Sequence, residues 1–544
     1  MHFVTRLALR SCPLRSMLAS YLIFLYIFSR VLWKNMQVVA VALLVIYASW
    51  ALFKQQKLNL PPGPTPLPII GSLHLLGTLP QKSLAELAKK YGPVMSVWLG
   101  QRLFIVATSP EAAKEFLKVQ DANFCFRPPF RAAKVLVPKD IVLHDITPVN
   151  RHLRKIFVSE LTSARRLEAS KNIRAEELAY MLRTVSKEKG PFRVNTHFHI
   201  ITTNIVSRMV LSKRFLGEGD QTGEAMSAVT NSTAFEFISI TEDMARLMGA
   251  IHPQDYFNFL PEWFDPQRLE PQFRKQATRM KLFYTKLVTE HKEERRKNPV
   301  SEDKKTMLDV LLEQLENPEF DITEEHVSCT IWDALMAGTD TTMVTSEWAM
   351  TEILRNPAIL KEVRAELDRV VGSDRTVQES DVPKLKYMQA VVKETLRLHP
   401  PVAMLIPHLN MNPTKAFGYD IPSKTRVFVN SWGIGRDPKV WDEPLEFQPK
   451  RFLEGGLHAG MDLQGQQQFD MLPFGSGRRL CPGVAFAVTS VNLQVASMFH
   501  AFDWSCPPGV VPEKLDMSET ATFVLQKRDP LLVVAKPRLS SHLY

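Results

Sequence analysis

Three long apolar stretches stand out along the chain, and each predicts a helix. Residues 36–53, MQVVAVALLVIYASWALF, carry no charged side chain over 18 positions. As a helix this stretch would be about 27 Å long, close to the ~30 Å hydrocarbon thickness of a bilayer. Residues 328–354 are apolar on nearly every face, as in a helix at the centre of a protein. A third run, VAFAVTSVNLQVASMF at 484–499, predicts another internal helix.

The first apolar stretch predicts a transmembrane anchor at residues 36–53. Lys54, Lys57 and a proline-rich segment follow it instead of a small-residue cleavage site, which favours an anchor over a cleaved signal peptide or a core helix. Residues 1–35 form a basic N-terminal extension. Its five cations exceed the two that closely follow the anchor, which by the positive-inside rule would send the body to the lumen. Three alternatives resolve this conflict: a start at Met36, a transit-like presequence, or a hairpin with the anchor.

Residues 54–69 form a proline-rich hinge between the anchor and the body. In PPGPTPLP, five of eight positions are proline, so this stretch should be a stiff, polyproline-like connection that orients the body against the membrane. An ordinary surface linker is the alternative. Beyond it, residues 70–544 contain no linker or internal repeat, and we expect one large catalytic domain.

The charge distribution argues against a nucleic-acid partner. The net charge is +10, but the first 60 residues hold seven cations and no acidic residue, which leaves only +3 for the rest of the chain. A nucleic-acid-binding protein would need a basic face on its folded body. The five cysteines are odd in number and widely spaced without a CxxC pair, so we expect no disulfide framework and a reducing surrounding for the body.

One of these cysteines, Cys481, has a local sequence suited to a metal ligand. In FGSGRRLCPG the glycines allow close approach to a flat cofactor, and the helix predicted to follow places its positive end near the sulfur. A thiolate needs such positive surroundings and backbone donors. Arg479, two residues earlier, can reach an anionic cofactor edge. A lone cysteine is more often an inert buried thiol, and the surrounding pattern reverses that judgement.

Two further motifs carry polar groups on predicted helices. In KETLRLHPP, Glu394 and Arg397 are three residues apart and therefore neighbours on one helix face. Such pairs are usually exposed, but this stretch is otherwise apolar. In AGTDTT, within the central helix, Asp340 and Thr341 place an acid beside an alcohol. A helix kink with hydroxyls bonded to preceding carbonyls is one interpretation. A proton relay from water, beside a local opening of the helix, is the other.

PPGP, AGTDTT, KETLRLHPP and FGSGRRLCPG, in this order, resemble the plant cytochromes P450 over about 480 residues. The resemblance implies a mainly α cytochrome P450 fold with a small β-rich lobe. It also implies haem b between the central helix and the cysteine loop, with Cys481 as the axial iron ligand. The other loop positions that it carries over to cofactor binding are Phe474, Gly477, Arg479 and Gly483.

The resemblance also assigns roles outside the loop. Arg451 would join Glu394 and Arg397 as a structural brace of the haem pocket, although Lys450 replaces the usual glutamate beside it. Arg154 and His408 would bind haem propionates, and a surface arginine and a structural histidine are the alternatives. Asn150 stands where the family often has an aromatic partner. Asp340 and Thr341 would be the catalytic acid and alcohol that deliver protons when dioxygen is split.

The activity implied is that of a monooxygenase that takes O2, a small-molecule substrate and electrons from NADPH-cytochrome P450 reductase. Segments such as GYDIPSKTRVFVN and PRLSSHLY resemble the phenylpropanoid and flavonoid hydroxylases of plants. An in-chain fatty-acid hydroxylase is the close alternative. An isomerase or dehydratase that acts on a peroxide, and a non-catalytic haem protein, are less favoured because they would not need Asp340 and Thr341.

Three regions are expected to line the substrate pocket: 130–148, 402–406 and 520–524. The implied location is the endoplasmic reticulum membrane, single-pass with a cytosolic body, or a plastid if residues 1–35 are a transit peptide. The aromatic segment DYFNFLPEWF at 255–264 suits either a membrane interface or, more simply, core packing.

Overall fold

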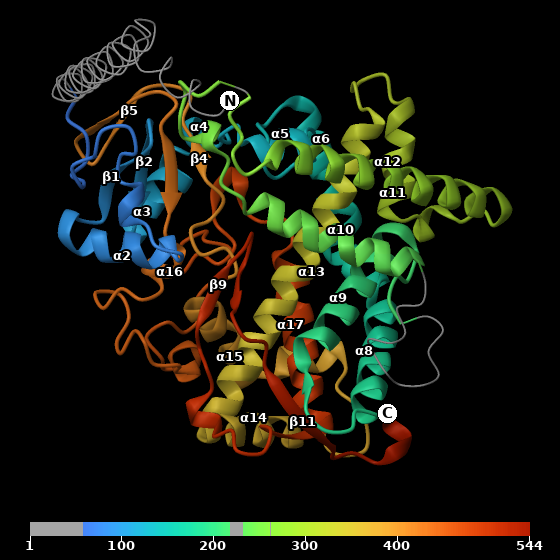
Figure 1. Cartoon of the computed structure of the whole chain (residues 1–544). Coiled ribbons are helices and arrows are strands. Elements are labelled where there is room, and N and C mark those ends of the chain that lie inside the picture. The colour runs from blue at the N-terminus through green and yellow to red at the C-terminus, as the bar shows by residue number, and fades with distance from the viewer. Residues whose placement is uncertain (1–57, 218–231, 262) are drawn as a thin grey trace, which may run out of the picture.

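The computed structural model describes residues 58–217, 232–261 and 263–544, and these form a mostly helical body with a smaller β-rich lobe (Figure 1). The predicted basic extension and transmembrane anchor lie outside the described residues. In Figure 1 the lobe, with α2, β1 and β2, lies to the left of the long central helix α13, and α10, α11 and α12 lie to its upper right. The mainly helical fold expected from the sequence is confirmed.

The central helix α13 runs over Glu324–Arg355, four residues longer at its start than the apolar pattern predicted. Thr323 and His326 form a capping box at its N-terminus, which satisfies backbone N–H groups that the first turn leaves unpaired. The helix ends at Arg355, and Asn356 and Pro357 follow, as expected. Its ladder is continuous through residues 337–342, so the expected local opening is absent from this helix.

The helices that pack most extensively on α13 and hold it in the interior are α9 (Val194–Leu211), α15 (Lys386–Leu398) and α17 (Val484–Ala501). Within the described part of the chain, only α17 is long and apolar enough to cross a bilayer, and most of it is buried inside the body. This is the behaviour of a core helix. The other helices named below are α2 (Pro80–Tyr91), α5 (Arg131–Leu136), α6 (Pro148–Phe157), α8 (Lys171–Ser186), α10 (Ser232–Met248), α11 (Leu269–Lys297), α12 (Met307–Glu313) and α14 (Pro357–Val370).

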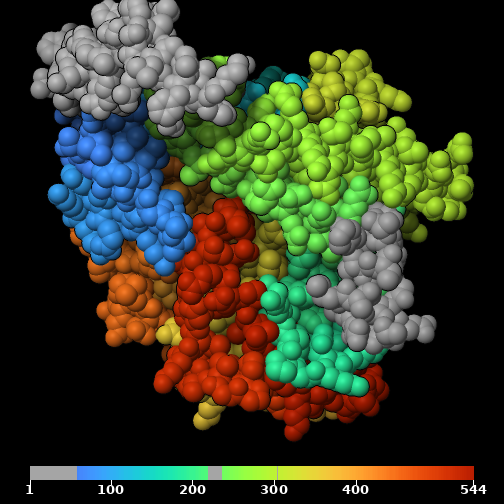
Figure 2. Space-filling view, viewed as in Figure 1, coloured from blue at the N-terminus to red at the C-terminus, as the bar shows by residue number. Residues whose placement is uncertain are grey.

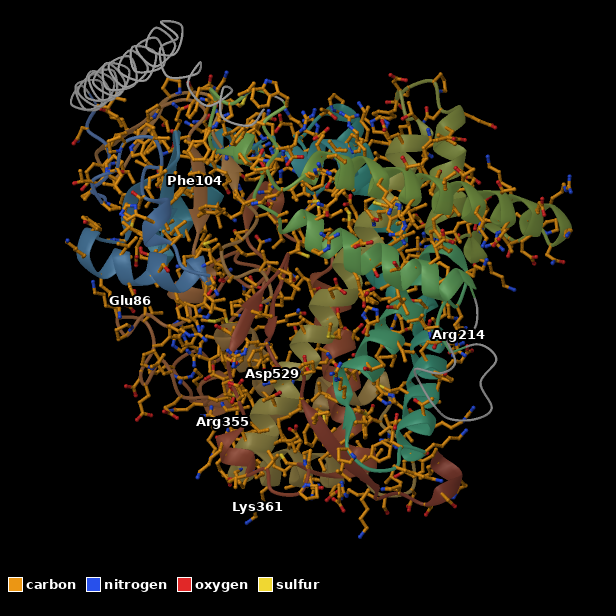
Figure 3. All side chains as sticks on the ribbon, viewed as in Figure 1. Glu86, Phe104, Arg214, Arg355, Lys361 and Asp529 are labelled. Carbon is orange, nitrogen blue, oxygen red and sulfur yellow. The ribbon has the colours of Figure 1, made fainter. Side chains whose placement is uncertain are left out.

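The β-rich lobe is built on a four-stranded sheet of order β1-β2-β7-β4. β1 and β2 pair antiparallel, β2 and β7 pair parallel, and β4 pairs antiparallel with β7. Phe104 of β2 is fully buried in this lobe, whereas Glu86 of α2 lies at its outer edge (Figure 3). The bounds are β1 (Val94–Leu99), β2 (Arg102–Ala107), β4 (His408–Leu409) and β7 (Arg426–Val429).

The described part of the proline-rich segment, from Leu58, is extended and docked on this lobe. The Pro61 carbonyl accepts a hydrogen bond from the Ser96 hydroxyl (2.8 Å), and the Pro62 carbonyl accepts one from the Ser96 N–H (2.9 Å). Gly63 passes so close to the strand that an added Cβ would lie 1.9 Å from the Ser96 carbonyl oxygen. At Pro61, Pro62 and Gly63 the segment is therefore bound to β1.

Short strands near the C-terminus complete the wall in front of α13. The hairpin of β9 (Glu519–Ala521) and β10 (Leu525–Lys527) turns at residues 522–524. β11 (Leu532–Pro537) pairs with β8 (Phe502–Ser505) and β3 (Phe192–Arg193). In Figure 2 this C-terminal region, in red, fills the face between the N-terminal lobe and α10. The second hairpin pairs β5 (Thr414–Ala416) with β6 (Tyr419–Ile421).

Candidate functional site

The principal cavity lies between α13 and the loop that carries Cys481. Ala337, Asp340 and Thr341 line it from α13, and Phe474 and Cys481 line it from the opposite side. The sequence separates these two walls by about 140 residues, and the packing of α17 against α13 brings them together. The AGTDTT and FGSGRRLCPG motifs therefore line the same cavity.

The backbone after Cys481 directs one N–H group toward the sulfur. The Gly483 N–H donates to Cys481 Sγ at 3.4 Å, and α17 begins at the next residue. The Cys481 N–H itself donates to the Phe474 carbonyl at 3.0 Å, which closes the loop. Burial raises the pKa of the Cys481 thiol, while the Gly483 N–H and the charge of Arg154 lower it. A bound iron cation would add the positive charge that favours the thiolate form of Cys481.

Gly477 is not among the residues that line the cavity, and the cofactor contact expected for it stays a prediction. Its φ is +64°, and a Cβ there would lie 1.9 Å from the Leu117 carbonyl oxygen. A side chain is therefore excluded by a neighbouring backbone and by a left-handed conformation. Gly477 shapes the loop. Gly483, by contrast, does line the cavity beside the sulfur.

Three arginines enter the cavity at the Cys481 end. Arg479 donates to the carbonyls of Cys125 (2.7 Å), Ile141 (3.3 Å) and His144 (2.5 Å). Arg154 donates to the Leu480 carbonyl. Each guanidinium has five N–H donors, so both retain donors beyond these main-chain bonds. Burial lowers the pKa of Arg479 to about 10, which leaves it charged at neutral pH.

Arg127 is the third arginine, and its place in the cavity was not predicted from the sequence. It is 7% exposed, lines the cavity, and donates to the carbonyls of Val142 (3.0 Å), Ile406 (2.7 Å) and Pro407 (2.9 Å). Nothing in FCFRPPF distinguishes it from a surface arginine, because tertiary packing alone brings it to the cavity. Spare donors on one buried and two partly buried arginines suit the two carboxylates of a haem.

His408 lines the same end of the cavity and is bound to a main-chain carbonyl. Its Nδ1–H donates to the Phe124 carbonyl at 2.8 Å. Burial and the charge of Arg127 lower the pKa of His408 to about 3, so the ring is neutral and its Nε2 carries no proton. In this state His408 offers an acceptor, and the arginines are the donors.

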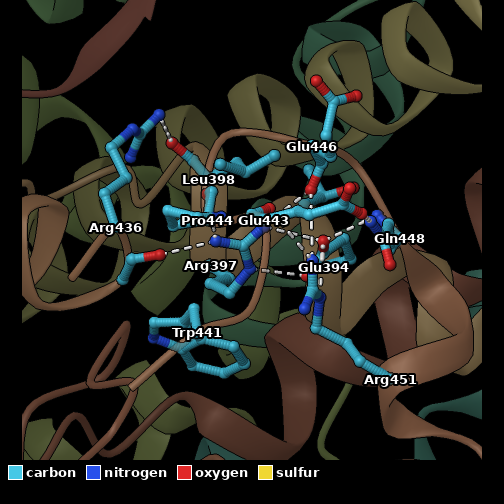
Figure 4. A network of polar contacts seen from close by, with 12 residues as sticks. Glu394, Arg397, Leu398, Arg436, Trp441, Glu443, Pro444, Glu446, Gln448 and Arg451 are labelled. Carbon is cyan, nitrogen blue, oxygen red and sulfur yellow. Dashed lines mark hydrogen bonds and ion pairs between the residues drawn. The ribbon is translucent and has the colours of Figure 1, made fainter. Parts of the chain in front are cut away.

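Glu394, Arg397 and Arg451 form a buried network behind the cavity (Figure 4). Both Glu394 oxygens accept from Arg397, at 2.6 and 2.7 Å, and one also accepts from Arg451 at 3.1 Å. Arg397 further donates to the carbonyls of Gly435, Pro444 and Glu446. Glu394 and Arg397 are 0% and 1% exposed, and the Trp441 ring lies 5.0 Å from the Arg397 guanidinium. These bonds tie α15 to the chain segment that precedes the Cys481 loop.

Asp340 and Thr341 both face the cavity from α13. The Thr341 hydroxyl donates to the Ala337 carbonyl at 2.7 Å, so the expected bond to a preceding carbonyl exists. Burial raises the pKa of Asp340 to about 6. The nearest basic group is His199 Nδ1, 3.9 Å from Asp340 Oδ1, which is too long for a direct hydrogen bond.

The remaining cavity wall is mostly apolar. All three regions expected to line it do so in part, through Val142, Val402 and Phe523 among others. α10 and α13 add Met244, Met248, Trp332 and Met336, which the sequence analysis had not placed there. Among the described residues no three His, Cys, Asp or Glu side chains meet to bind a metal ion. The donor set thus fits a macrocycle held by one thiolate and several arginines.

Comparisons with known proteins agree with this geometry. The family model described as Cytochrome P450 matches residues 61–534. Cytochrome P450 98A2 of Glycine max is 35% identical over 93% of this chain and 98% of its own length. Flavonoid 3'-monooxygenase of Petunia hybrida is 36% identical over 90% of this chain and 94% of its own length. A zebra fish cytochrome P450 solved with abiraterone has a TM-score of 0.68 and 26% identity, covering 85% of this chain and 100% of that one.

Proposed function

Because this chain belongs to the cytochrome P450 family and is a monooxygenase of that family, we propose that it hydroxylates a small aromatic plant metabolite of the phenylpropanoid-ester or flavonoid class. The observation that carries the substrate class is the similarity to flavonoid hydroxylases over almost the whole chain. The cavity supports it, because Trp332, Phe523 and several methionines offer an apolar wall for a flat ring.

The charges of the cavity favour a neutral aromatic over a fatty acid. The three arginines that line it, Arg127, Arg154 and Arg479, gather at the Cys481 end and are bound to main-chain carbonyls. On the α10 side the described lining is methionine, alanine and tryptophan. A fatty-acid carboxylate there would be buried without a cation, which is costly.

In the proposed site, each residue has a separate task. Cys481 would hold the haem iron, and Arg127, Arg154 and Arg479 would bind the propionates. When bound, haem b supplies the activation of dioxygen, and the thiolate ligand favours cleavage of the O–O bond. Asp340 and Thr341 hold protons at the cavity edge and pass them inward. Glu394, Arg397 and Arg451 keep the surrounding backbone fixed.

The proposed partners are NADPH-cytochrome P450 reductase and the lipid of the endoplasmic reticulum, with the body in the cytosol. Exposed apolar side chains support a membrane-facing side. Ile70 precedes β1, and Phe259 and Trp263 follow α10; Trp263 is 81% exposed. Both segments bond to the turn at residues 100–101, which places them on one side of the lobe. The aromatic segment is therefore only partly packed in the core.

The substrate class is tested by turnover of a panel that contains a coumaroyl ester, a flavonoid and a fatty acid. The full chain in membranes would receive NADPH and the reductase, with Cys481→Ala as the matched inactive control. We expect hydroxylated aromatic product that requires both NADPH and reductase. Turnover of the fatty acid alone would overturn the aromatic class. Conversion of a peroxide without reductase would instead identify an isomerase or dehydratase.

A further inference from the structure

Two carboxyl groups are buried against each other beside the cavity, outside the proton relay described above. Asp333 comes from α13 and Asp140 from the connection between α5 and α6. They are 8% and 1% exposed, and both line the cavity. Carboxylates at such depth are normally paired with a cation. No ion pair joins Asp333 to a cation among the residues that the structure describes, and its neighbour is the second acid.

The hydrogen bonds around the pair account for one shared proton. Asp333 Oδ2 accepts from the Ile141 N–H at 2.8 Å. Asp140 accepts from the Leu143 N–H at 3.0 and 3.1 Å through its two oxygens, and from His144 Nδ1 at 2.6 Å. Asp140 thus has the donors of an ionised group. The two carboxyl groups lie close enough to interact directly, and a hydrogen bond between them would require a proton on one of them.

Asp333 is the member that holds the proton. Burial and the adjacent Asp140 raise its pKa well above the ordinary value of an aspartate. The other charged or titratable groups near the pair are His144 in the same loop, Cys329 on α13, and Arg127 and Arg479, both close to Asp140. Two carboxylates in contact cannot both be ionised at low cost. With one proton between them, the two carboxyl groups can accept from the Ile141 N–H, the Leu143 N–H and His144 Nδ1 together.

The loop at residues 141–144 binds the two acids through its N–H groups and the arginines through its carbonyl groups. Its N–H groups at Ile141 and Leu143 bind the two acids. Its carbonyls at Ile141 and His144 accept from Arg479, and the Val142 carbonyl accepts from Arg127. The loop is thus fixed on one side by the acids and on the other by two cavity arginines. A shift of the acids would move the acceptors of both guanidinium groups.

We propose that Asp140 and Asp333 share one proton and act as positioning residues, which hold Arg127 and Arg479 where they bind the haem propionates. This inference rests on the proposed haem site. Asp140 and Asp333 touch neither substrate nor iron; they act through residues 141–144. Asparagine at 333 can mimic the protonated acid, because its Oδ1 accepts from Ile141 and its Nδ2 donates to Asp140. Asparagine at 140 cannot accept as a carboxylate does from Leu143 and His144.

The test compares Asp333→Asn, Asp333→Leu and Asp140→Asn in the full-length holoprotein. The readouts are the rate of haem transfer to excess apomyoglobin, the reduction potential and the reduced, carbon-monoxide-bound spectrum. Asp333→Asn should release haem at close to the wild-type rate. Asp333→Leu and Asp140→Asn should release it about 10-fold faster or more, since each loses hydrogen bonds to a charged or buried group. Asp381→Asn, at a buried carboxylate remote from the cavity, is the matched control.

The pH dependence separates a shared proton from simple packing. A carboxyl group whose pKa is raised in the folded protein makes the folded state less stable as pH rises from the unfolded-state pKa toward the folded-state pKa, because folding must then return a proton to the buried site. Wild-type haem release should therefore accelerate with rising pH, and Asp333→Asn should lose this acceleration. Wild-type release rates in all variants would overturn the positioning role. Fast release from Asp333→Asn, equal to that from Asp333→Leu, would overturn the shared proton. A wild-type chain that binds no haem would instead refute the proposed function.

Discussion

Replacement of Glu394 by glutamine is expected to lower the free energy of unfolding by about 3 to 5 kcal/mol, because it leaves two buried guanidinium groups without their anion. Glu394 is the only carboxylate bonded to Arg397 among the described residues, and it also accepts from Arg451 and from the Gln448 N–H. Its loss would free the segment at 442–451 that precedes the Cys481 loop. We expect little haem to be retained by the variant.

The chain provides a matched control for this change. Glu86 and Lys89 form an ion pair with the same spacing on α2, but their side chains are 69% and 71% exposed. Glu86→Gln should cost at most about 0.5 kcal/mol. Urea unfolding monitored by circular dichroism measures both variants. If Glu394→Gln and Glu86→Gln lower the free energy of unfolding by the same small amount, burial of the network does not make it stabilising.

Replacement of Asp340 by asparagine or of Thr341 by alanine is expected to lower product formation about 10²-fold or more, the usual contribution of a positioned proton donor. NADPH oxidation should fall less than product, with the difference appearing as hydrogen peroxide. Thr330→Ala on the same helix is the control, because its hydroxyl makes the same bond to a preceding carbonyl but lies outside the cavity lining. If the wild type and all of these variants form the same amount of product per NADPH oxidised, the proton relay is contradicted.

The pKa of Asp340 fixes the direction of the pH effect. Burial raises it to about 6, so the carboxyl still holds its proton where an ordinary aspartate has lost it. Above pH 6 the protonated fraction falls about tenfold per pH unit. Product per NADPH should therefore decrease as pH rises through 6 in the wild type. Asp340→Asn should be low throughout and show no such step.

Local patterns predicted the parts of the site that neighbouring residues build. FGSGRRLCPG specified the loop around Cys481, and the spacing of Glu394 and Arg397 placed them on one face of α15. The end of α13 followed from Asn356 and Pro357, but its start did not, because the cap uses His326 where a glutamate or glutamine is the usual signal.

The contacts that the sequence did not predict join distant segments. Arg127 reaches the cavity by binding carbonyls about 280 positions away, and Asp140 meets Asp333 across 193 positions. No local periodicity encodes such contacts. Gly477 was assigned to the cofactor because glycine suits close approach, yet the surface it approaches is the backbone at Leu117. The pattern indicated a need for glycine but not the partner.

The central claim, that Cys481 is the thiolate ligand of a haem, is tested most directly by the absorption spectrum of the reduced, carbon-monoxide-bound protein. Wild type and Cys481→Ala would be compared with Cys506→Ala, in which a second half-buried thiol, outside the cavity lining, is removed. We predict the red-shifted Soret maximum of thiolate ligation in the wild type and in Cys506→Ala, and its loss in Cys481→Ala. A wild-type maximum at the position of ordinary histidine-ligated haem would contradict the claim.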